Sequence, residues 1–278
     1  DGFGFLTEVG TSSGVFGASA SSGVSMWDVE LDGDVDVFVG VHSTADIMWL
    51  NDGGGMFRDG TGDLDMRNAM SWVATAPGGL SVGDVDNDGD EDIVCGNTAG
   101  SIGVFENLGI AENGLPKWDA PKLLRPKSHD GSLSPFRVMA GPNGSIQGPC
   151  EAKWGYTTFT VADWNHDGLL DVVLNSIWGK VLWYRNVGSK TEPTLAAAKN
   201  VDVQWPGKTP KPAWTWWEPD GKQLATQWRT TPVVVDMNGD KLNDLVMLDQ
   251  EGYLALFERK MLPGVAGDGK NDPLVLLP

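Results

Sequence analysis

An acidic stretch of nine residues that recurs four times constrains this sequence most. The clearest copy runs from Asp84 to Asp92, with carboxylates at positions 1, 3, 5, 7 and 9 and Gly89 at position 6. Hard cations such as calcium take six to eight oxygen ligands. Alternate residues of a tight loop can direct their oxygens inward, while the glycine permits the sharp turn. Without a cation, carboxylates this close repel one another, so the pattern predicts a calcium-binding loop.

The other three copies begin at Asp28, Asp163 and Asp236. In the last copy Lys241 takes the turn-glycine position and Gly239 precedes it, so we expect the weakest metal site there. Leucine at position 7 offers only its backbone carbonyl, which is what this position contributes in calcium loops. The predicted metal ligands are Asp28, Glu30, Asp32, Asp34 and Asp36; Asp84, Asp86, Asp88, Asp90 and Asp92; Asp163, Asn165, Asp167, Leu169 and Asp171; and Asp236, Asn238, Asp240, Leu242 and Asp244.

The loops differ from those of EF-hands, which need flanking helices and a bidentate glutamate at position 12. Position 12 is apolar in every copy here, as Val39, Cys95, Leu174 and Met247. The flanks are short apolar runs rich in β-branched residues, such as 233–235, and these indicate buried strands. Each unit is therefore predicted to be a strand, a calcium loop and a second strand.

Beyond each loop the sequence continues with an apolar strand, a polar or glycine-containing turn and another apolar strand, which is a hairpin pattern. Unbroken apolar runs indicate strands covered on both faces, as in sheets arranged radially around an axis. We therefore predict an all-β propeller of about four blades plus partial strands, either closed or part of a larger ring. The predicted division is a single domain over 1–278, with repeats at 1–51, 52–108, 109–188 and 189–260, and with a tail or the start of a further blade at 261–278.

The copies Asp84–Asp92 and Asp163–Asp171, each between apolar strands, resemble the FG-GAP and VCBS-type repeats. The stretch Asp-Gly-Gly-Gly-Met-Phe at 52–57 is similar to the link between such repeats in bacterial members. The resemblance implies a calcium-binding β-propeller, like integrin α-subunit heads and many secreted bacterial proteins. It also implies that Asp84, Asp86, Asp88, Asp92 and their counterparts ligate calcium through their side chains. Bacterial propellers of this class often occur with polysaccharide-processing or adhesion functions, which is an analogy of fold.

Charge and length narrow the range of partners. Acidic residues outnumber basic ones by 38 to 20, for a formal net charge of −18. This sign disfavours nucleic acid and anionic membranes as partners, and no apolar run approaches the length of a membrane span. Low-affinity calcium loops work best where calcium is millimolar, so we expect a secreted, periplasmic or cell-surface protein. Cys95 and Cys150 are compatible with one disulfide or with two free thiols.

An aromatic insertion within 189–228 is the first candidate ligand site. It contains Trp205, Trp214, Trp216 and Trp217 among several prolines, which indicate an ordered loop. Flat indole rings with a polar edge suit stacking on sugar rings. The alternative is that these tryptophans pack the insertion against its own blade.

The second candidate is the segment from His129 to Tyr156. A lyase acting on uronic-acid polysaccharides needs a cation to neutralise the carboxylate, and a His, Tyr or Lys as base and acid. His129, Arg137, Lys153 and Tyr156 supply residues of these types. Their mutual geometry cannot be read from the sequence.

Taken together, these features predict a binding protein: an extracellular, calcium-stabilised propeller that recognises carbohydrate or protein through its rim loops. One alternative is a lyase-like polysaccharide-degrading enzyme with its site on the insertion-bearing face. Another is a structural scaffold segment of a larger protein. A deep groove lined by the four lyase candidates would favour the enzyme, whereas a flat face with exposed Trp214 or Trp216 would favour sugar binding.

Overall fold

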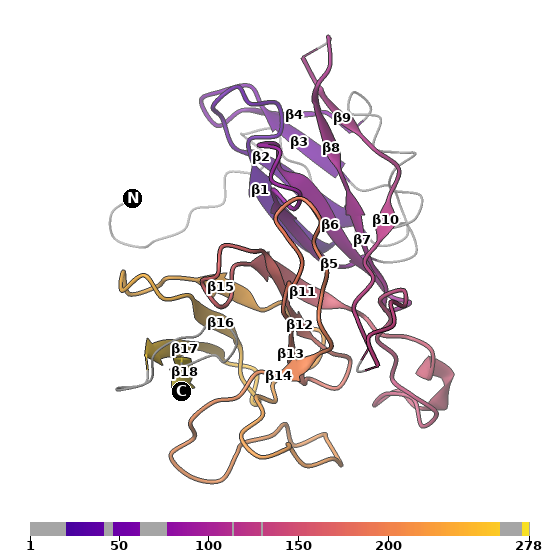
Figure 1. Ribbon diagram of the computed structural model, residues 1–278, viewed down its shortest axis with the longest axis vertical. Coiled ribbons are helices and arrows are strands. Elements are labelled where there is room, and N and C mark those ends of the chain that lie inside the picture. The colour runs from indigo at the N-terminus through magenta and orange to yellow at the C-terminus, as the bar shows by residue number, and fades with distance from the viewer. Residues whose placement is uncertain are drawn as a thin grey trace.

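The computed structural model describes residues 21–41, 47–61, 77–112, 114–128, 130–261 and 274–277. Within these ranges the chain forms four antiparallel sheets of four strands each and one separate two-stranded hairpin. The sheets follow one another in chain order along a curve, from the first at the top of Figure 1 to the fourth at the lower left. This is a β-propeller arrangement of four blades, as the repeated strand pattern predicts.

Each blade is built from four strands. The first sheet contains β1 (Ser21–Trp27), β2 (Asp36–Val41), β3 (Ile47–Asn51) and β4 (Phe57–Asp59). The second sheet contains β5 (Pro77–Gly83), β6 (Asp92–Asn97), β7 (Ile102–Phe105) and β10 (Lys122–Leu123). Between β7 and β10 the chain forms the separate hairpin of β8 (Asn107–Ile110) and β9 (Pro116–Trp118).

The third and fourth blades repeat this order after long insertions. The third contains β11 (Thr158–Ala162), β12 (Asp171–Asn175), β13 (Val181–Tyr184) and β14 (Lys199–Asn200). The fourth contains β15 (Val233–Val235), β16 (Asp244–Leu248), β17 (Leu254–Met261) and β18 (Leu274–Leu277). A 3-10 turn, η2 (Pro149–Glu151), lies in the insertion before β11.

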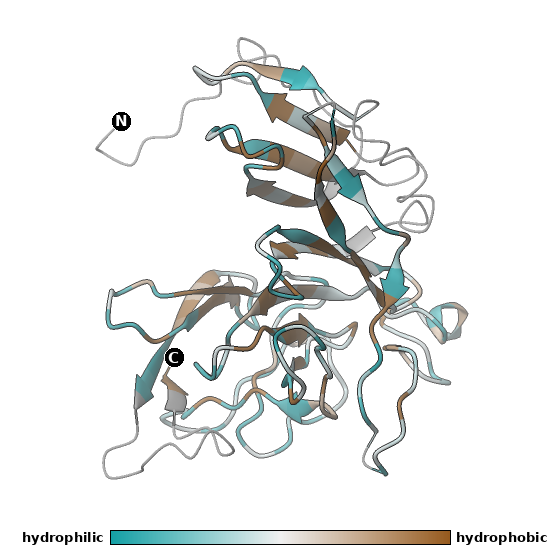
Figure 2. Cartoon of the chain, turned by 45° about the horizontal axis from the view of Figure 1, so that its top comes forward, coloured by the Kyte–Doolittle hydropathy of each residue, from teal (hydrophilic) through white to brown (hydrophobic). Residues whose placement is uncertain are grey.

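Three hydrophobic cores lie between consecutive blades. Phe38 and Met48 of the first blade pack with Ile93 of the second, and Val94 of the second with Phe159 of the third. A third core joins Val173 to its neighbours in the fourth blade. Side chains on alternate residues of a strand point to opposite faces of the sheet. The unbroken apolar strands therefore supply both neighbouring cores, and Figure 2 shows them as brown ribbons inside the curve.

The blade boundaries differ from the repeat boundaries expected from the sequence. The strand at Phe57–Asp59 pairs with β3 and so completes the first blade, although its repeat was predicted to begin at residue 52. Leu274–Leu277 pairs with β17 as the outer strand of the fourth blade, so this part of the predicted tail does not start a further blade. The reason is that an outer strand needs a paired neighbour, and the preceding hairpin supplies it.

Two smaller sequence questions are also answered. Cys95 is buried and Cys150 is exposed, and no disulfide joins the two. Among the residues that the structure describes, no helix is long and apolar enough to cross a membrane.

Candidate functional site

The four acidic loops occupy equivalent places, each joining the first strand of a blade to the second. Their backbones share one shape, with left-handed φ angles at positions 4 and 6. These residues are Leu31, Asn87, His166 and Gly239 at position 4, and Gly33, Gly89, Gly168 and Lys241 at position 6. Such angles favour glycine, because a Cβ atom meets the neighbouring carbonyl there. The fourth loop therefore keeps the common shape even though its glycine stands at position 4.

The second loop brings three carboxylates together. Asp84, Asp86 and Asp88 each offer an oxygen, and these atoms all lie within 4.8 Å of one another. The backbone N–H of Asp88 holds two of the side chains in place, donating to Asp84 Oδ1 at 3.1 Å and to Asp86 Oδ1 at 3.3 Å. Burial, followed by the charge of Asp88, raises the pKa of Asp86. No other cluster of this kind occurs in the described part of the chain.

The first loop has a buried acceptor without a partner. Glu30 at position 3 places Oε2 out of contact with solvent, and no group donates a hydrogen bond to it. Burial, followed by the charge of Asp36, raises the pKa of Glu30 to about 7. The nearest cation is Arg58, whose Nη2 lies 3.8 Å from Glu30 Oε1. A divalent ion at this point would satisfy the orphaned oxygen and offset the repulsion.

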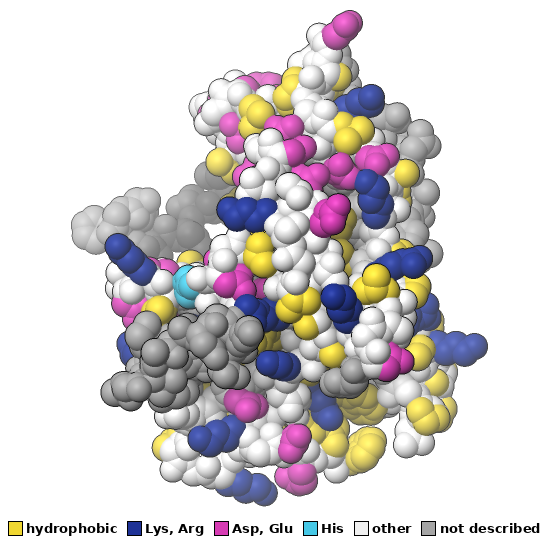
Figure 3. Space-filling model, viewed as in Figure 1, with side chains coloured by type: hydrophobic (Ala, Val, Ile, Leu, Met, Phe, Trp, Pro, Cys, Tyr) yellow, Lys and Arg dark blue, Asp and Glu magenta, His cyan; other side chains and the backbone are white. Residues whose placement is uncertain are grey.

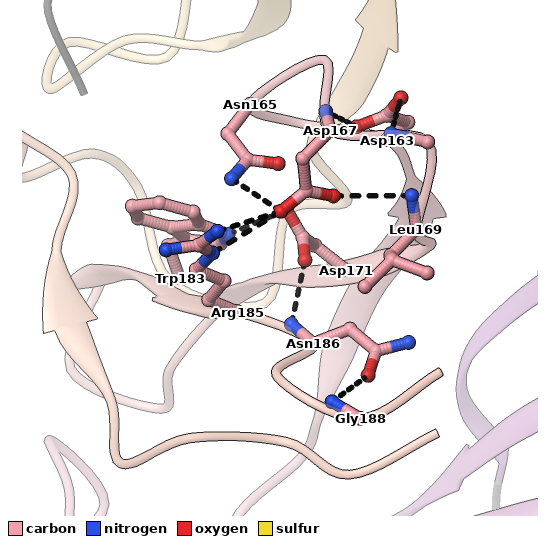
Figure 4. A network of polar contacts seen from close by, with 10 residues as sticks. Asp163, Asn165, Asp167, Leu169, Asp171, Trp183, Arg185, Asn186 and Gly188 are labelled. Atoms are coloured by element: carbon pink, nitrogen blue, oxygen red, sulfur yellow. Dashed lines mark hydrogen bonds and ion pairs between the residues drawn. The ribbon is translucent and has the colours of Figure 1, made fainter. Parts of the chain in front are cut away.

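In the third loop an arginine reaches into the acidic cluster (Figure 4). Arg185 comes from the end of β13 and its Nη2 lies 2.8 Å from Asp167 Oδ2, which also accepts a bond from Asn165 Nδ2 at 2.9 Å. Burial acts to raise the pKa of Asp167, but the bonds from Arg185 and Asn165 outweigh it, so the net shift is downward. Asn165 Oδ1 remains buried without a hydrogen-bond donor. This loop thus combines an orphaned acceptor with a carboxylate already neutralised.

The fourth loop is held by its own backbone. Asp236 accepts bonds from the N–H groups of Gly239, Asp240 and Lys241, at 2.7, 3.2 and 2.9 Å. Lys260 lies nearby, with Nζ 3.8 Å from Asp240 Oδ2. The oxygen at position 3, on Asn238, already accepts the Asp240 N–H at 2.9 Å. The position-1 aspartates of the first and third loops accept equivalent backbone bonds, so the expectation that Lys241 makes the fourth loop the weakest metal site stays a prediction.

The aspartate at position 9 has a role that the spacing alone did not reveal. In the second loop, Asp92 Oδ2 accepts the Val85 N–H at 2.9 Å and Oδ1 accepts the Asn107 N–H at 2.9 Å. The counterparts Asp36, Asp171 and Asp244 are also buried. Each accepts hydrogen bonds from two N–H groups, which belong to the loop, to the third strand of the blade or to residues just after that strand. These side chains fasten loop to sheet, and whether they also ligate metal stays a prediction.

One histidine connects two loops. His166, at position 4 of the third loop, is exposed, and its Nε2 accepts the N–H of Asn243 in the fourth loop at 3.1 Å. Asn243 Nδ2 in turn donates to the Asp163 carbonyl at 2.7 Å. Neighbouring loops therefore contact each other along the rim.

The donor set suits a hard cation in three of the loops. The second loop has converging carboxylates, and the first and third have buried oxygen acceptors without donors. Oxygen-only ligand sets of this kind favour calcium or magnesium over softer metals. Acidic side chains gather over the upper part of the molecule, where the first two blades lie (Figure 3). The predicted ligands of these loops therefore fit calcium.

A second feature lies at the opposite end of the blades. The turns that join the second strand to the third lie one strand length from the acidic loops, and aromatic residues collect there. Trp178, in one such turn, contacts Trp216 edge to face with ring centroids 5.8 Å apart. Trp178 Nε1 also donates to the Ala140 carbonyl at 3.1 Å, and the Ala140 N–H donates to the Trp154 carbonyl at 2.9 Å.

The remaining aromatic rings extend this surface through an arginine. Arg229 lies with its guanidinium carbon 3.3 Å from the ring centre of Tyr156 and 4.0 Å from that of Trp228. Trp154 contacts Tyr156, and Trp214 contacts Trp228, with centroid distances of 5.5 and 6.2 Å. We call this set the aromatic face: Trp154, Tyr156, Trp178, Trp214, Trp216 and Trp228.

The four tryptophans predicted from the insertion differ in exposure. Trp216 is 71% exposed, whereas Trp217 is buried at 9% and lies under the Lys180 ammonium at 4.5 Å. Trp205 is half-buried and packs its edge against Phe257. Trp214 is half-buried, and its Nε1 donates to Gln227 Oε1 at 3.0 Å. Packing therefore accounts for Trp205 and Trp217, and Trp216 presents its ring to solvent.

The structure describes three of the four residues considered for lyase chemistry. His129 lies outside the described residues. Arg137 Nη2 donates to the Lys153 carbonyl at 3.3 Å, and both side chains are exposed. Burial and the hydrogen bond to Glu151 raise the pKa of Tyr156 to about 12, so its hydroxyl stays protonated near neutral pH. Residue types alone could not reveal that Glu151 ties up this hydroxyl.

Comparison with known proteins gives the following. Residues 28–95 match the model of an FG-GAP-like repeat. No curated protein matches the chain. Among solved structures, the chain is similar to a lectin from Agrocybe aegerita, studied for its specific recognition of non-reducing terminal N-acetylglucosamine. The identity is 14% and the TM-score 0.34, with 81% of this chain and 59% of the lectin covered.

The chain therefore spans about three fifths of the length of that lectin, and so distant a match carries no argument about a ligand. What the comparisons and the structure show together is a match to an FG-GAP-like repeat over residues 28–95 and four blades in chain order, each with an equivalent acidic loop. The chain is a β-propeller of four blades that contains an FG-GAP-like repeat at residues 28–95.

Proposed function

We propose that this chain is a calcium-stabilised, extracellular β-propeller that binds carbohydrate through its aromatic face. The observation that carries the proposal is Trp216, an indole that is 71% exposed yet held in edge contact with Trp178. A large apolar ring left in water is costly to maintain, and exposed aromatic surface marks interaction sites. Indole rings held flat by their neighbours are suited to stacking on the apolar face of a sugar.

The framework around Trp216 supports a preformed site. Trp178 is fixed through its Nε1 bond to Ala140, and Trp214 through its bond to Gln227. Tyr156 and Arg229 both adopt left-handed backbone angles, with φ of 45° and 57°. Such strain in non-glycine residues persists only where the surrounding structure enforces it, and it clusters at binding and active sites. A rigid surface loses little conformational entropy when it binds a ligand.

The calcium component rests on the FG-GAP-like repeat and on the loops whose acceptors suit a hard cation. When bound, calcium would neutralise the charges of Asp84, Asp86 and Asp88. In the first loop it would give the Glu30 Oε2 atom a partner that the protein itself does not provide. Loops of moderate affinity fill where calcium is millimolar, which supports a secreted, periplasmic or cell-surface location. Fractionation of cells that produce the protein would check the location.

The binding test compares wild type with Trp216→Ala by electrophoresis through gels that contain neutral or acidic polysaccharides. We expect retardation of the wild type by at least one neutral polysaccharide. Loss of one stacked ring, worth about 1–1.5 kcal/mol, should weaken binding roughly tenfold. Met56→Ala is the matched control, because Met56 is 55% exposed at the acidic-loop end of the blade. Equal retardation of all three proteins would contradict the assignment of the aromatic face.

The same polysaccharides distinguish binding from cleavage. Incubation with each one and measurement of ultraviolet absorbance would detect the unsaturated products of a lyase. We expect none, because Tyr156 is held protonated by Glu151. Accumulation of unsaturated products would replace the binding proposal with an enzymatic one.

A further inference from the structure

A cleft of about 280 Å³ lies between the second and third blades, at the end of the blades that carries the acidic loops. Its volume is close to the lower end of the range for small-molecule sites, about 300 Å³. The lining side chains that could contact a ligand are Asp84, Val85 and Asn87 from the second blade and Leu170, Asn186 and Lys190 from the third. None of these residues belongs to the aromatic face.

Asn186 carries the feature that points to a ligand. This residue lies just after β13 and is only 2% exposed. Its Oδ1 accepts the N–H groups of Gly188 and Thr194, each at 3.0 Å, which fixes the orientation of the amide. No described residue accepts a hydrogen bond from Nδ2, and Figure 4 shows this nitrogen without a bond. A largely buried donor without an acceptor costs free energy, which a ligand in the cleft would recover.

The equivalent amides of the first two blades already have acceptors. Asn51 and Asn107 each donate from Nδ2 to the position-8 carbonyl of the loop in their own blade, at 3.1 and 3.4 Å. Position 8 of the third loop is Leu170, and in the described chain no such bond joins its carbonyl to Asn186. The third blade therefore leaves this donor free beside the cleft.

Leu170 and Lys190 shape the side of the cleft that the third blade supplies. Leu170 reaches across to the second blade, where its Cδ1 lies 3.4 Å from the place that a Cβ atom on Gly83 would take. The Lys190 side chain runs over the third loop, with its Cε 3.9 Å from the place of a Cβ on Gly168. Lys190 is exposed, and its ammonium forms no ion pair with a described residue. The cleft thus combines an apolar floor with two free donors.

The charges of the cleft favour a neutral ligand. Asp84 and Lys190 are the charged side chains that line it, one of each sign. An anion would be repelled by Asp84 and its acidic neighbours in the second loop, and a cation would be repelled by Lys190. Hydroxyl groups can accept hydrogen bonds from Asn186 and Lys190 and donate to Asp84 or Asn87. A sugar ring offers several hydroxyls at its edge and an apolar face that suits Leu170.

We propose that this cleft binds one sugar ring, with Asn186 Nδ2 and the Lys190 ammonium donating to its hydroxyl groups and Asp84 accepting from another. A carboxylate has about four lone-pair sites, so Asp84 can bind a cation in its loop and accept this bond as well. The site lies at the opposite end of the blades from the aromatic face. The inference therefore does not depend on the ligand of that face.

The test is a nuclear magnetic resonance titration, in buffer with calcium, of methyl glycosides of several hexoses and of mannitol. We expect at least one glycoside to shift the side-chain amide resonance of Asn186, which the spectrum of Asn186→Asp identifies by its absence. Asn186→Asp keeps an acceptor for the Gly188 and Thr194 N–H groups and removes the donor. Lys190→Met keeps the aliphatic stem and removes the ammonium. Each variant should weaken binding of the glycoside roughly fivefold.

Two matched variants control for changes in charge and in the amide. Lys117→Met removes an exposed ammonium from β9, outside the cleft. Asn107→Asp changes the equivalent amide of the second blade, whose Nδ2 already has an acceptor. Both variants should bind the glycoside with the affinity of the wild type.

Three results would overturn the proposal. The first is that no glycoside moves the Asn186 resonance, and the second is that Lys190→Met binds as tightly as the wild type. The third is that Trp216→Ala abolishes the shift, because the effect would then come from the aromatic face. Equal binding of mannitol, which has hydroxyls but no ring, would overturn the assignment to a sugar ring.

Discussion

At the scale of single residues, the acidic loops show how one backbone shape tolerates different sequences. Positions 4 and 6 have left-handed φ angles in all four copies. Three loops supply glycine at position 6, and the fourth supplies Lys241 there with φ of 69°. A side chain in this conformation costs about 1–2 kcal/mol. Each loop has one such residue: the first three have it at position 4, and the fourth has it at position 6, where the others have glycine.

Replacing Lys241 by glycine should stabilise the protein. Relief of the left-handed strain exceeds the added flexibility of glycine in the unfolded chain, which costs about 0.5–1 kcal/mol. We expect a net gain of roughly 0.5–1 kcal/mol, or a rise in Tm of about 1–4 °C for a chain of this size. Differential scanning calorimetry with excess chelator measures this effect without a contribution from metal affinity.

The mirror substitution provides the control for Lys241→Gly. Gly89 has φ of 104°, and a Cβ added there would meet nothing within 4 Å. Gly89→Lys should therefore lower Tm through backbone strain alone. A fall in Tm for Lys241→Gly, or no change for Gly89→Lys, would show that backbone strain does not control these loops.

At the scale of elements, a network of polar side chains joins the insertion before β11 to the segment before β15. Glu151 is 3% exposed and accepts bonds from Ser145 and Tyr156, and its Oε1 lies 3.0 Å from Arg229 Nη2. Burial acts to raise the pKa of Glu151, but these three partners outweigh it and the net shift is downward. The network therefore holds the Tyr156 and Arg229 part of the aromatic face in place.

This network predicts a pH-dependent contribution to stability. Because the pKa of Glu151 is lower in the folded state, the contribution is fully present above the ordinary value of 4.5 and is lost as the pH falls through the folded-state pKa. Glu151→Gln should cost about 1–3 kcal/mol at neutral pH. The difference from wild type in the free energy of unfolding should shrink as the pH falls below the ordinary pKa.

Urea unfolding across this pH range measures the difference, and Glu218→Gln serves as the control. Glu218 pairs with Lys211 at the surface, where exposed ion pairs contribute little. A Glu151→Gln effect that did not change between neutral and acidic pH would mean that the ion pair and its hydrogen bonds do not stabilise the fold.

At the scale of the whole molecule, the two ends of the blades carry different kinds of side chain. The acidic loops lie at one end and carry much of the net charge of −18, while the aromatic face lies at the other. Because the loops tie first strands to second strands, and His166 and Asn243 tie loop to loop, loss of cations would loosen the rim first. The aromatic end is held by separate hydrogen bonds.

If calcium fills these loops as proposed, its removal should lower the stability of the fold. A site that is filled at a hundred times its Kd contributes about 2.7 kcal/mol, so a chelator should lower Tm by several degrees or more. Asp86→Asn with Asp88→Asn should reduce this calcium-dependent shift, because these carboxylates belong to the converging group of the second loop. Asp220→Asn, an exposed position outside the loops, should retain it.

Thermal melts with and without excess calcium make the comparison. An identical melting curve in chelator and in calcium would exclude occupied stabilising sites, and the calcium component of the proposed function would have to be abandoned.

The sequence alone determined the repeating unit: strand, acidic loop, strand and turn, and from it the four-blade propeller. It could do so because these features depend on residues close in the chain, such as the alternation around Asp84 and the apolar run after Asp92. Left-handed positions, apolar alternation and carboxylate spacing are all local properties.

Only the tertiary structure decided how distant residues meet. Arg185 neutralises Asp167 because β13 ends beside the third loop, and Glu151 reaches Arg229 because two insertions cross at one end of the blades. It also separated the exposed Trp216 from the buried Trp217, which are adjacent in sequence. The physical reason is that the exposure of a side chain and the partners of a buried acceptor depend on which sheets and insertions pack together, and local patterning does not fix that.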